Sequence, residues 1–196
     1  MADRAARSGD FYETLGWLGR ICGGGILLLS AACTTVTVSP VIPAPANIQT
    51  YRSVTLGAVD AQQPEYAYVI QFFREGFVRR LNELKAFDSV GDNSPNPPGP
   101  GTLVVAATMI EVDKGDVALR FFVGMGAGRE RAGAHLVIKS ADGSTIGTFD
   151  VHKAYSGGAG IGGASLIDIE DLTKQVGEQA AQSLVDWSQG KLTASN

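Results

Sequence analysis

The chain has 196 residues, of which 44% are hydrophobic and 18% charged, and its formal net charge is −4. This length and composition indicate one well-buried core with extensions and argue against two large domains. The 16 Lys and Arg residues form no basic stripe, so nucleic-acid binding is not expected. Both cysteines, Cys22 and Cys33, lie in the first fifth of the chain, which leaves the folded part without a disulfide framework or a Cys-based metal site.

An uncharged apolar run covers residues 21–32 and follows Arg20. It is too short to cross a hydrocarbon core of about 30 Å as a helix, and it is typical of a secretory signal peptide. The run ends in Leu29-Ser30-Ala31-Ala32-Cys33, which resembles the lipobox of bacterial lipoproteins. The resemblance implies that residues 1–32 are removed as a signal peptide and that Cys33 carries lipid. The alternative is a short buried helix of a cytosolic protein, for which three consecutive glycines are a poor start.

A segment rich in Pro, Thr and Val follows, and we interpret residues 33–52 as the lipidated cysteine and a tether. Its prolines, Pro40, Pro43 and Pro45, exclude a helix or a central strand. At about 3.1 Å per residue, an extended segment from Thr34 to Thr50 spans on the order of 50 Å. Thr34 in place of Asp after the cysteine implies, by the same resemblance, transfer to the outer membrane. We therefore expect a protein anchored by lipid on the periplasmic side of the outer membrane.

Residues 53–190 have the pattern of a single α/β domain, which residues 191–196 follow as a tail. Alternating apolar residues predict a strand over Ser53–Asp60, and apolar residues three and four apart predict a helix over Gln63–Phe87. A loop rich in Gly and Pro then leads to a second strand, Thr102–Val112. Strand, helix and strand in this order predict a right-handed parallel crossover.

The second half continues with a third predicted strand, Val117–Val123, and with a hairpin. The hairpin pairs Ala132–Ser140 with Thr145–Tyr155 around a two-residue turn at Asp142-Gly143. A last amphipathic helix begins near Asp168, where carboxylates suit a helix N-terminus, and it ends near Gly190. The predicted fold class is α/β (α+β): a two-layer sandwich in which a mixed sheet of about five strands carries two amphipathic helices on one face.

Two glycine clusters are the candidate functional loops. The first contains Gly124, Gly126 and Gly128, and the second contains Gly158 and Gly160. The second cluster formally matches GxGxxG, but no further strand follows its helix to supply the acidic residue of a dinucleotide site. The first lacks the Lys and Ser or Thr of a phosphate-binding loop. We therefore expect no cofactor and interpret both clusters as turns.

Few side chains suggest catalysis or metal binding. A metal site would have only His135 and His152 as imidazole ligands, so we expect no metal. Counting outward from the hairpin turn places His135 opposite Asp150, on the face away from Leu136. We interpret this as a cross-strand ion pair, since the predicted neighbours include no activated nucleophile for a catalytic dyad.

Several segments together resemble a bacterial family catalogued as a domain of unknown function, family 4410. They are Arg120 to Gly128, the strand Ala132 to Lys139, the turn at Asp142-Gly143 and the turn Ser156-Gly157-Gly158, and the resemblance extends over Val54 to Trp187. Members are mostly predicted lipoproteins of Gram-negative bacteria, and the family name implies no activity. Two functions stay open: a non-catalytic module that binds an envelope protein partner, which we favour, and a periplasmic ligand-binding domain or enzyme that uses the glycine loops.

Overall fold

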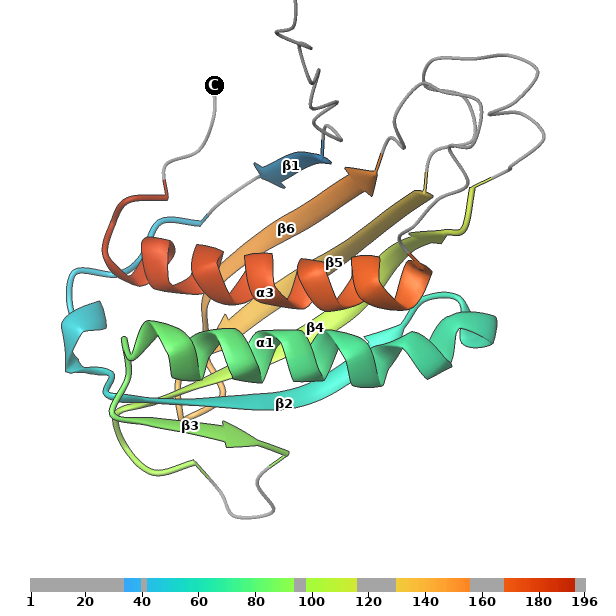
Figure 1. The fold of residues 1–196 in the computed structure, drawn as a ribbon. Helices are drawn as coiled ribbons and strands as arrows, with labels where there is room; N and C mark the ends of the chain where they lie inside the picture. The colour runs from blue at the N-terminus through green and yellow to red at the C-terminus, as the bar shows by residue number, and fades with distance from the viewer. Residues whose placement is uncertain (1–33, 40–41, 94–97, 116–129, 156–167, 193–196) are drawn as a thin grey trace, which may run out of the picture. The chain divides into compact units, whose positions relative to one another are not determined.

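The computed structural model describes residues 34–39, 42–93, 98–115, 130–155 and 168–192. These residues form one six-stranded mixed sheet in the order β1-β6-β5-β4-β2-β3, with α1 and α3 side by side on one face (Figure 1). The strands are β1 (Thr34–Ser39), β2 (Ser53–Ala61), β3 (Ser89–Asp92), β4 (Thr102–Asp113), β5 (Glu130–Lys139) and β6 (Thr145–Tyr155). The helices are η1 (Ile48–Thr50), η2 (Pro64–Val69), α1 (Ile70–Leu84) and α3 (Ile169–Ser188).

This arrangement confirms the predicted two-layer sandwich, with six strands in place of about five. Strands β1 and β3 were not predicted, and the predicted strand Val117–Val123 lies outside the described residues. Strand β3 has only four residues and lies where the sequence enters its Gly- and Pro-rich stretch, so its pattern was too short to stand out from a loop.

The strands of the predicted crossover, β2 and β4, are parallel neighbours, but the unpredicted β3 comes between α1 and β4 in the chain. Strand β2 pairs in parallel with β4, beginning at Ser53 and Thr102, and also with β3. The predicted helix Gln63–Phe87 is split into η2, with Pro64 at its first position, and α1. Helix α1 ends at Leu84, because the next residue, Lys85, has a left-handed φ of 51° that cannot continue a helix.

The hairpin of β5 and β6 has the predicted register and a different turn. His135 lies opposite Asp150, as predicted, and Leu136 lies opposite Phe149. The loop has three residues, 141–143, because the Ser140 amide pairs with the Ser144 carbonyl at 3.0 Å and the Gly143 amide donates to the Ser140 carbonyl at 2.9 Å. A register shift near the hairpin end absorbs the additional loop residue, as expected for a three-residue hairpin loop closed by a left-handed glycine.

Asp142 fixes this turn through its carboxylate. Its Oδ1 accepts the Ser144 amide at 2.8 Å and also accepts hydrogen bonds from the Ser140 and Ser144 hydroxyls. These bonds, that of Ser140 first, lower the pKa of Asp142 to about 2 because they stabilise its charged form.

The segment after Cys33 packs against the domain, and the expected extended tether is wrong for its described part. Strand β1 pairs antiparallel with β6 along its whole length, from Thr34 opposite Tyr155 to Ser39 opposite Asp150. Further on, the carbonyl of Ile42 accepts the indole N–H of Trp187 at 2.7 Å. Prolines excluded a central strand here, but alternating Thr and Val suit an edge strand.

The core lies between the sheet and the two helices. Phe73 and Phe77 of α1 stack with ring centroids 5.9 Å apart, and the Trp187 side chain at the end of α3 is 1% exposed. Helices α1 and α3 approach closely at Gly76 and Gly177, where an added Cβ would clash with the backbone of the other helix. The buried residues of the inner faces of β5, β6 and both helices are Leu136, Ile138, Phe149, Val151, Phe73, Phe77, Leu81, Leu172, Val176, Ala180, Leu184 and Trp187.

Candidate functional site

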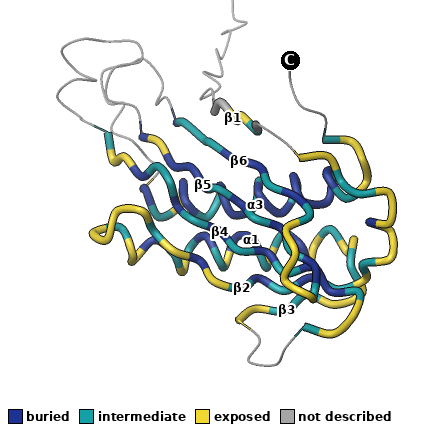
Figure 2. The backbone as a smooth tube through the Cα atoms, turned by 180° about the vertical axis from the view of Figure 1, so that it is seen from behind, coloured by how far each residue is buried: buried dark blue, intermediate teal, exposed yellow. Residues whose placement is uncertain are grey.

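The sheet face opposite the helices, here called the open face, carries no helix in the described part of the chain (Figure 2). Its side chains alternate along each strand with those of the core, and they are half-buried rather than buried. The open face is formed by Val104, Ala106 and Thr108 of β4, His135, Val137 and Lys139 of β5, and Thr148, Asp150 and His152 of β6. It combines short apolar side chains with histidines and carboxylates.

His135 and Asp150 form the predicted cross-strand pair. The Nδ1 atom of His135 lies 2.5 Å from Oδ1 of Asp150, and the two side chains are 41% and 26% exposed. Thr108 of β4 lies opposite His135 on its other side. The sequence did not place Thr108 here, since the register of β4 and β5 depends on a connection that has no short turn signal.

His152 makes a second polar pair in the next row across the sheet. Its Nδ1 lies 3.2 Å from Oε2 of Glu111 on β4, and Nη1 of Arg131 lies 3.8 Å from Oε1 of the same carboxylate. Gly133 of β5 lies between His152 of β6 and Glu111 of β4. A Cβ at this position would be 2.7 Å from Nδ1 of His152. The glycine therefore leaves room for the imidazole to cross β5.

His152 lies opposite Gly133 in the hairpin register, but its partner Glu111 could not be predicted from the sequence. The β4–β5 register shifts between Met109 and Glu111, and no local pattern reveals that shift. Within the described residues, no group of three His, Cys, Asp or Glu side chains is arranged to hold a metal ion.

A shallow groove of about 560 Å³ lies over β2, β3 and the start of β4. Its described lining residues carry no charged side chain and are mainly small or hydroxylated, including Ser53, Thr55, Gly57, Ser89, Gly91 and Val104. The Ser89 hydroxyl donates to the Ser53 hydroxyl at 2.8 Å. Such a lining can accept and donate weak hydrogen bonds, but among the described residues it offers no acid, base or activated nucleophile.

The candidate residues from the sequence, Cys33, Gly124, Gly126, Gly128, Gly158 and Gly160, lie outside the described residues. The strands on either side of these residues in the chain are described. The end of β4, the start of β5, the end of β6 and the start of β1 all lie at one end of the sheet, here called the loop end. Asp113 at the end of β4 pairs with Arg131, Glu130 pairs with Tyr155 at the end of β6, and Thr34 pairs with Tyr155 from the other side. The chain therefore leaves the sheet at this same end toward both glycine clusters and toward Cys33.

The loop end also carries a group of aromatic and basic side chains. The rings of Tyr66 and Tyr68 in η2 have centroids 6.4 Å apart, and Nζ of Lys114, just after β4, lies 5.3 Å from the Tyr68 ring centroid. A hydrogen bond with Tyr68 is the main cause that raises the pKa of Lys114, so the ammonium stays charged near neutral pH. None of the described helices has the length and apolar character to span a bilayer.

Comparison with solved structures finds distant similarities. Two crystal forms of the PelC dodecamer from Paraburkholderia phytofirmans are similar in fold, one of them a point variant. The variant is 11% identical to this chain with a TM-score of 0.48, covering 78% of this chain and 97% of its own. The other is 8% identical with a TM-score of 0.48, covering 82% and 100%. No curated protein matches the chain.

The family model described as Domain of unknown function (DUF4410) matches residues 44–159. The match includes β2 to β6; compared with the range Val54 to Trp187 predicted from the sequence, it begins earlier and ends earlier, before α3. It contains both histidine pairs of the open face and the chain between β4 and β5. The chain belongs to the DUF4410 family.

Proposed function

We propose that this protein is a lipoprotein, anchored through Cys33 on the periplasmic side of the outer membrane, whose domain binds an envelope protein partner without catalysing a reaction. The observation that carries the binding role is the open face, which is the broad side of the sheet that helices do not cover in the described structure. Its centre is apolar, with Ala106 opposite Val137, and histidine–carboxylate pairs lie beside it. Apolar area bordered by polar groups is typical of a protein interface.

Exposure of the histidines argues for binding rather than catalysis. His135 and His152 are 41% and 37% exposed, whereas a general base works best in a closed site where water is excluded. Thr108 lies opposite His135 on β4, but the hydrogen bond that the described structure gives the His135 side chain is the one with Asp150. A cross-strand pair of this kind stabilises a sheet by about 0.2 to 1 kcal/mol.

The second candidate function is a ligand-binding domain, and the shallow groove over β2 and β3 is the observation that favours it. The groove has a volume of about 560 Å³, within the range of about 300 to 1,000 Å³ for small-molecule sites. It differs from most such sites because the described lining is small and uncharged. An enzyme that uses the glycine loops would need groups from residues outside the described structure.

Substitution of the two cysteines tests the anchor. Cys33→Ser removes the only thiol at the lipobox, so we expect this variant to leave the membrane fraction. Cys22→Ser is the matched control, because Cys22 lies inside the apolar run and should not affect the anchor. A Cys33→Ser variant that still sediments with membranes as the wild type does would contradict the anchor.

Site-specific photocrosslinking tests the open face. A photoreactive residue at Val137 lies at the centre of the open face, and one at Glu83 lies on the exposed side of α1 as the control. We expect a protein adduct in intact cells from position 137 and none from position 83. Adducts from position 83 alone would contradict the assignment of the open face as the binding surface.

A further inference from the structure

The distance between the anchor and the folded sheet is set by β1. Cys33 directly precedes Thr34, and Thr34 is the first residue of β1 and pairs with Tyr155. Consecutive Cα atoms are about 3.8 Å apart. A lipid on Cys33 is therefore attached one residue from the sheet, without an intervening flexible segment.

Strand β1 is also held firmly enough to transmit this constraint. All six of its residues pair with β6, and Val38 packs against the hydrophobic core. Beyond the strand, the amide of Ile42 donates to the carbonyl of Thr148 at 3.2 Å, and the Ile42 carbonyl accepts the Trp187 indole. Detaching the segment breaks these bonds together.

From this geometry we infer that the loop end of the sheet rests on the lipid surface and that the strands point away from it. The inference depends on the proposed anchor at Cys33. It replaces the free tether expected from the sequence with a fixed orientation, in which the end of the sheet at Thr34 and Tyr155 faces the bilayer.

The side chains of the loop end suit such contact. Tyr68 is 39% exposed and lies under the ammonium of Lys114, and Tyr66 packs partly against the core. Tyr and Lys both combine an apolar body with a polar tip, and they favour the boundary between lipid tails and water. Tyr68 belongs to η2 and Lys114 directly follows β4, and the fold brings these two segments into contact.

The charges of the loop end indicate which lipid surface it accepts. Carboxylates surround the N-terminus of α3, at Asp168, Glu170 and Asp171, and Asp113 ends β4. These four carboxylates outnumber the ammonium of Lys114, so the described residues beside it carry a net negative charge, which an anionic surface repels. The contact therefore suits a zwitterionic surface such as phosphatidylethanolamine.

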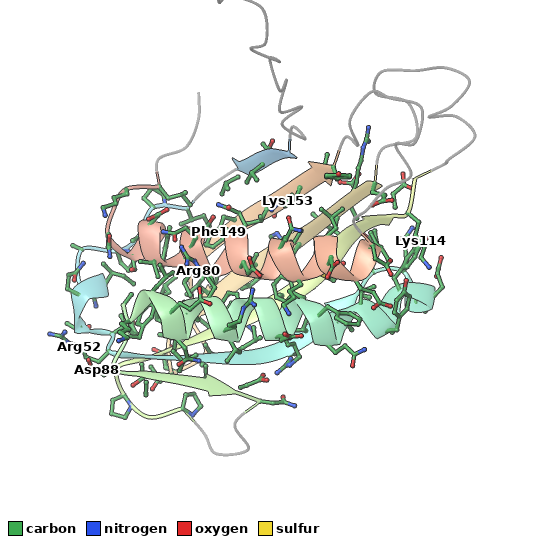
Figure 3. The ribbon with its side chains drawn as sticks, in the orientation of Figure 1. Arg52, Arg80, Asp88, Lys114, Phe149 and Lys153 are labelled. Atoms are coloured by element: carbon green, nitrogen blue, oxygen red, sulfur yellow. The ribbon has the colours of Figure 1, made fainter. Side chains whose placement is uncertain are left out.

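Two labelled positions at opposite ends of the sheet test this orientation. Lys114 lies at the loop end, and Asp88 lies at the far end, beside Arg52 (Figure 3). Both side chains are exposed. The ends are separated by β4, whose 12 residues span about 36 Å at 3.3 Å per residue.

The experiment uses the full-length lipidated protein, reconstituted into phosphatidylethanolamine-rich vesicles that contain a nitroxide-labelled headgroup. Processing removes Cys22 and lipid occupies Cys33, so Lys114→Cys or Asp88→Cys supplies a single thiol for a fluorophore. We expect the nitroxide to quench the Lys114→Cys label several-fold more than the Asp88→Cys label. Inserting 12 Gly and Ser residues before Thr34, with a mean reach of about 19 Å, should reduce this difference.

Mass spectrometry of the same samples separates the two proposals. Protein without lipid on Cys33 overturns the anchor and the orientation together. Protein that carries lipid but shows equal quenching at both positions overturns the orientation alone. Stronger quenching at Asp88→Cys overturns it as well, because the far end then faces the bilayer.

Discussion

Replacing Gly76 by Ala at the crossing of α1 and α3 should destabilise the domain, although alanine is the better helix former. An added Cβ would lie 2.9 Å from the carbonyl carbon of Lys174 and closer still to its oxygen. Two non-bonded carbon atoms lie about 3.5 Å apart or more, so the backbones of α1 and α3 must move apart by at least roughly 0.6 Å. Gly177 meets α1 in the same way, with an added Cβ 2.9 Å from the Phe77 nitrogen.

The expected loss follows from two opposing effects. Overpacking a tight contact costs about 1 to 3 kcal/mol, and both partners here are backbone, which moves less easily than a side chain. We therefore expect overpacking to cost about 3 kcal/mol of folding free energy. The higher helix propensity of Ala offsets about 1 kcal/mol of this cost. The net loss of about 2 kcal/mol corresponds to a fall of roughly 4 to 8 °C in Tm for a domain of this size.

Thermal unfolding followed by circular dichroism measures this difference on Gly76→Ala, Gly177→Ala and the double variant. Gly99→Ala is the control, because an added Cβ there meets nothing within 4 Å. We expect the double variant to lose less than the sum of the single variants, since one separation of the helices relieves both clashes. A Tm that rises in Gly76→Ala would refute the reasoning, because helix propensity would then outweigh the contact.

Four other changes have defined outcomes. Deleting residues 34–50 should lower Tm by several degrees, since β1 and its contacts with the domain are lost; an unchanged Tm would support the free tether instead. Gly147→Ala should lower Tm too, because its Cβ would lie 2.9 Å from Cε2 of the buried Trp187 ring. His135→Gln should cost no more than about 1 kcal/mol and leave membrane location unchanged; loss of an activity without loss of fold would favour an enzyme. Asp142→Ala should be less stable than wild type at neutral pH, and urea titrations should show this difference fading as pH falls from its ordinary pKa of 3.8 toward about 2, because a depressed pKa stabilises the fold only while the carboxylate is charged.

The hairpin shows how far local pattern could predict this structure. The alternation of β5 and β6 determined which residues face the core, and with the turn signal it placed His135 opposite Asp150. The turn itself has one residue more than predicted, and a register shift compensates for it. Because the additional loop residue and the register shift compensate for each other, the alternation of apolar residues along the two strands does not reveal either of them.

Long-range pairings could not be predicted in this way. Glu111 and Thr108 reach the histidines only through the register of β4 and β5, and Gly76 looks like an ordinary weak position of an amphipathic helix until α3 is placed beside it. Strand β1 was missed for a related reason. Its partner, β6, lies more than a hundred residues later in the chain, and the prolines after it favoured an irregular segment.

The pairing of β1 with β6 has a consequence for the order of folding. Strand β6 pairs with a strand that lies more than a hundred residues earlier in the chain, so the two can meet only after the intervening residues have been brought together. Closing so long a loop is entropically costly, and such contacts generally form slowly. Until β1 arrives, β6 is an exposed sheet edge whose unpaired amides and carbonyls can recruit strands from other molecules. Aggregation during refolding should therefore be most severe in chains that lack β1.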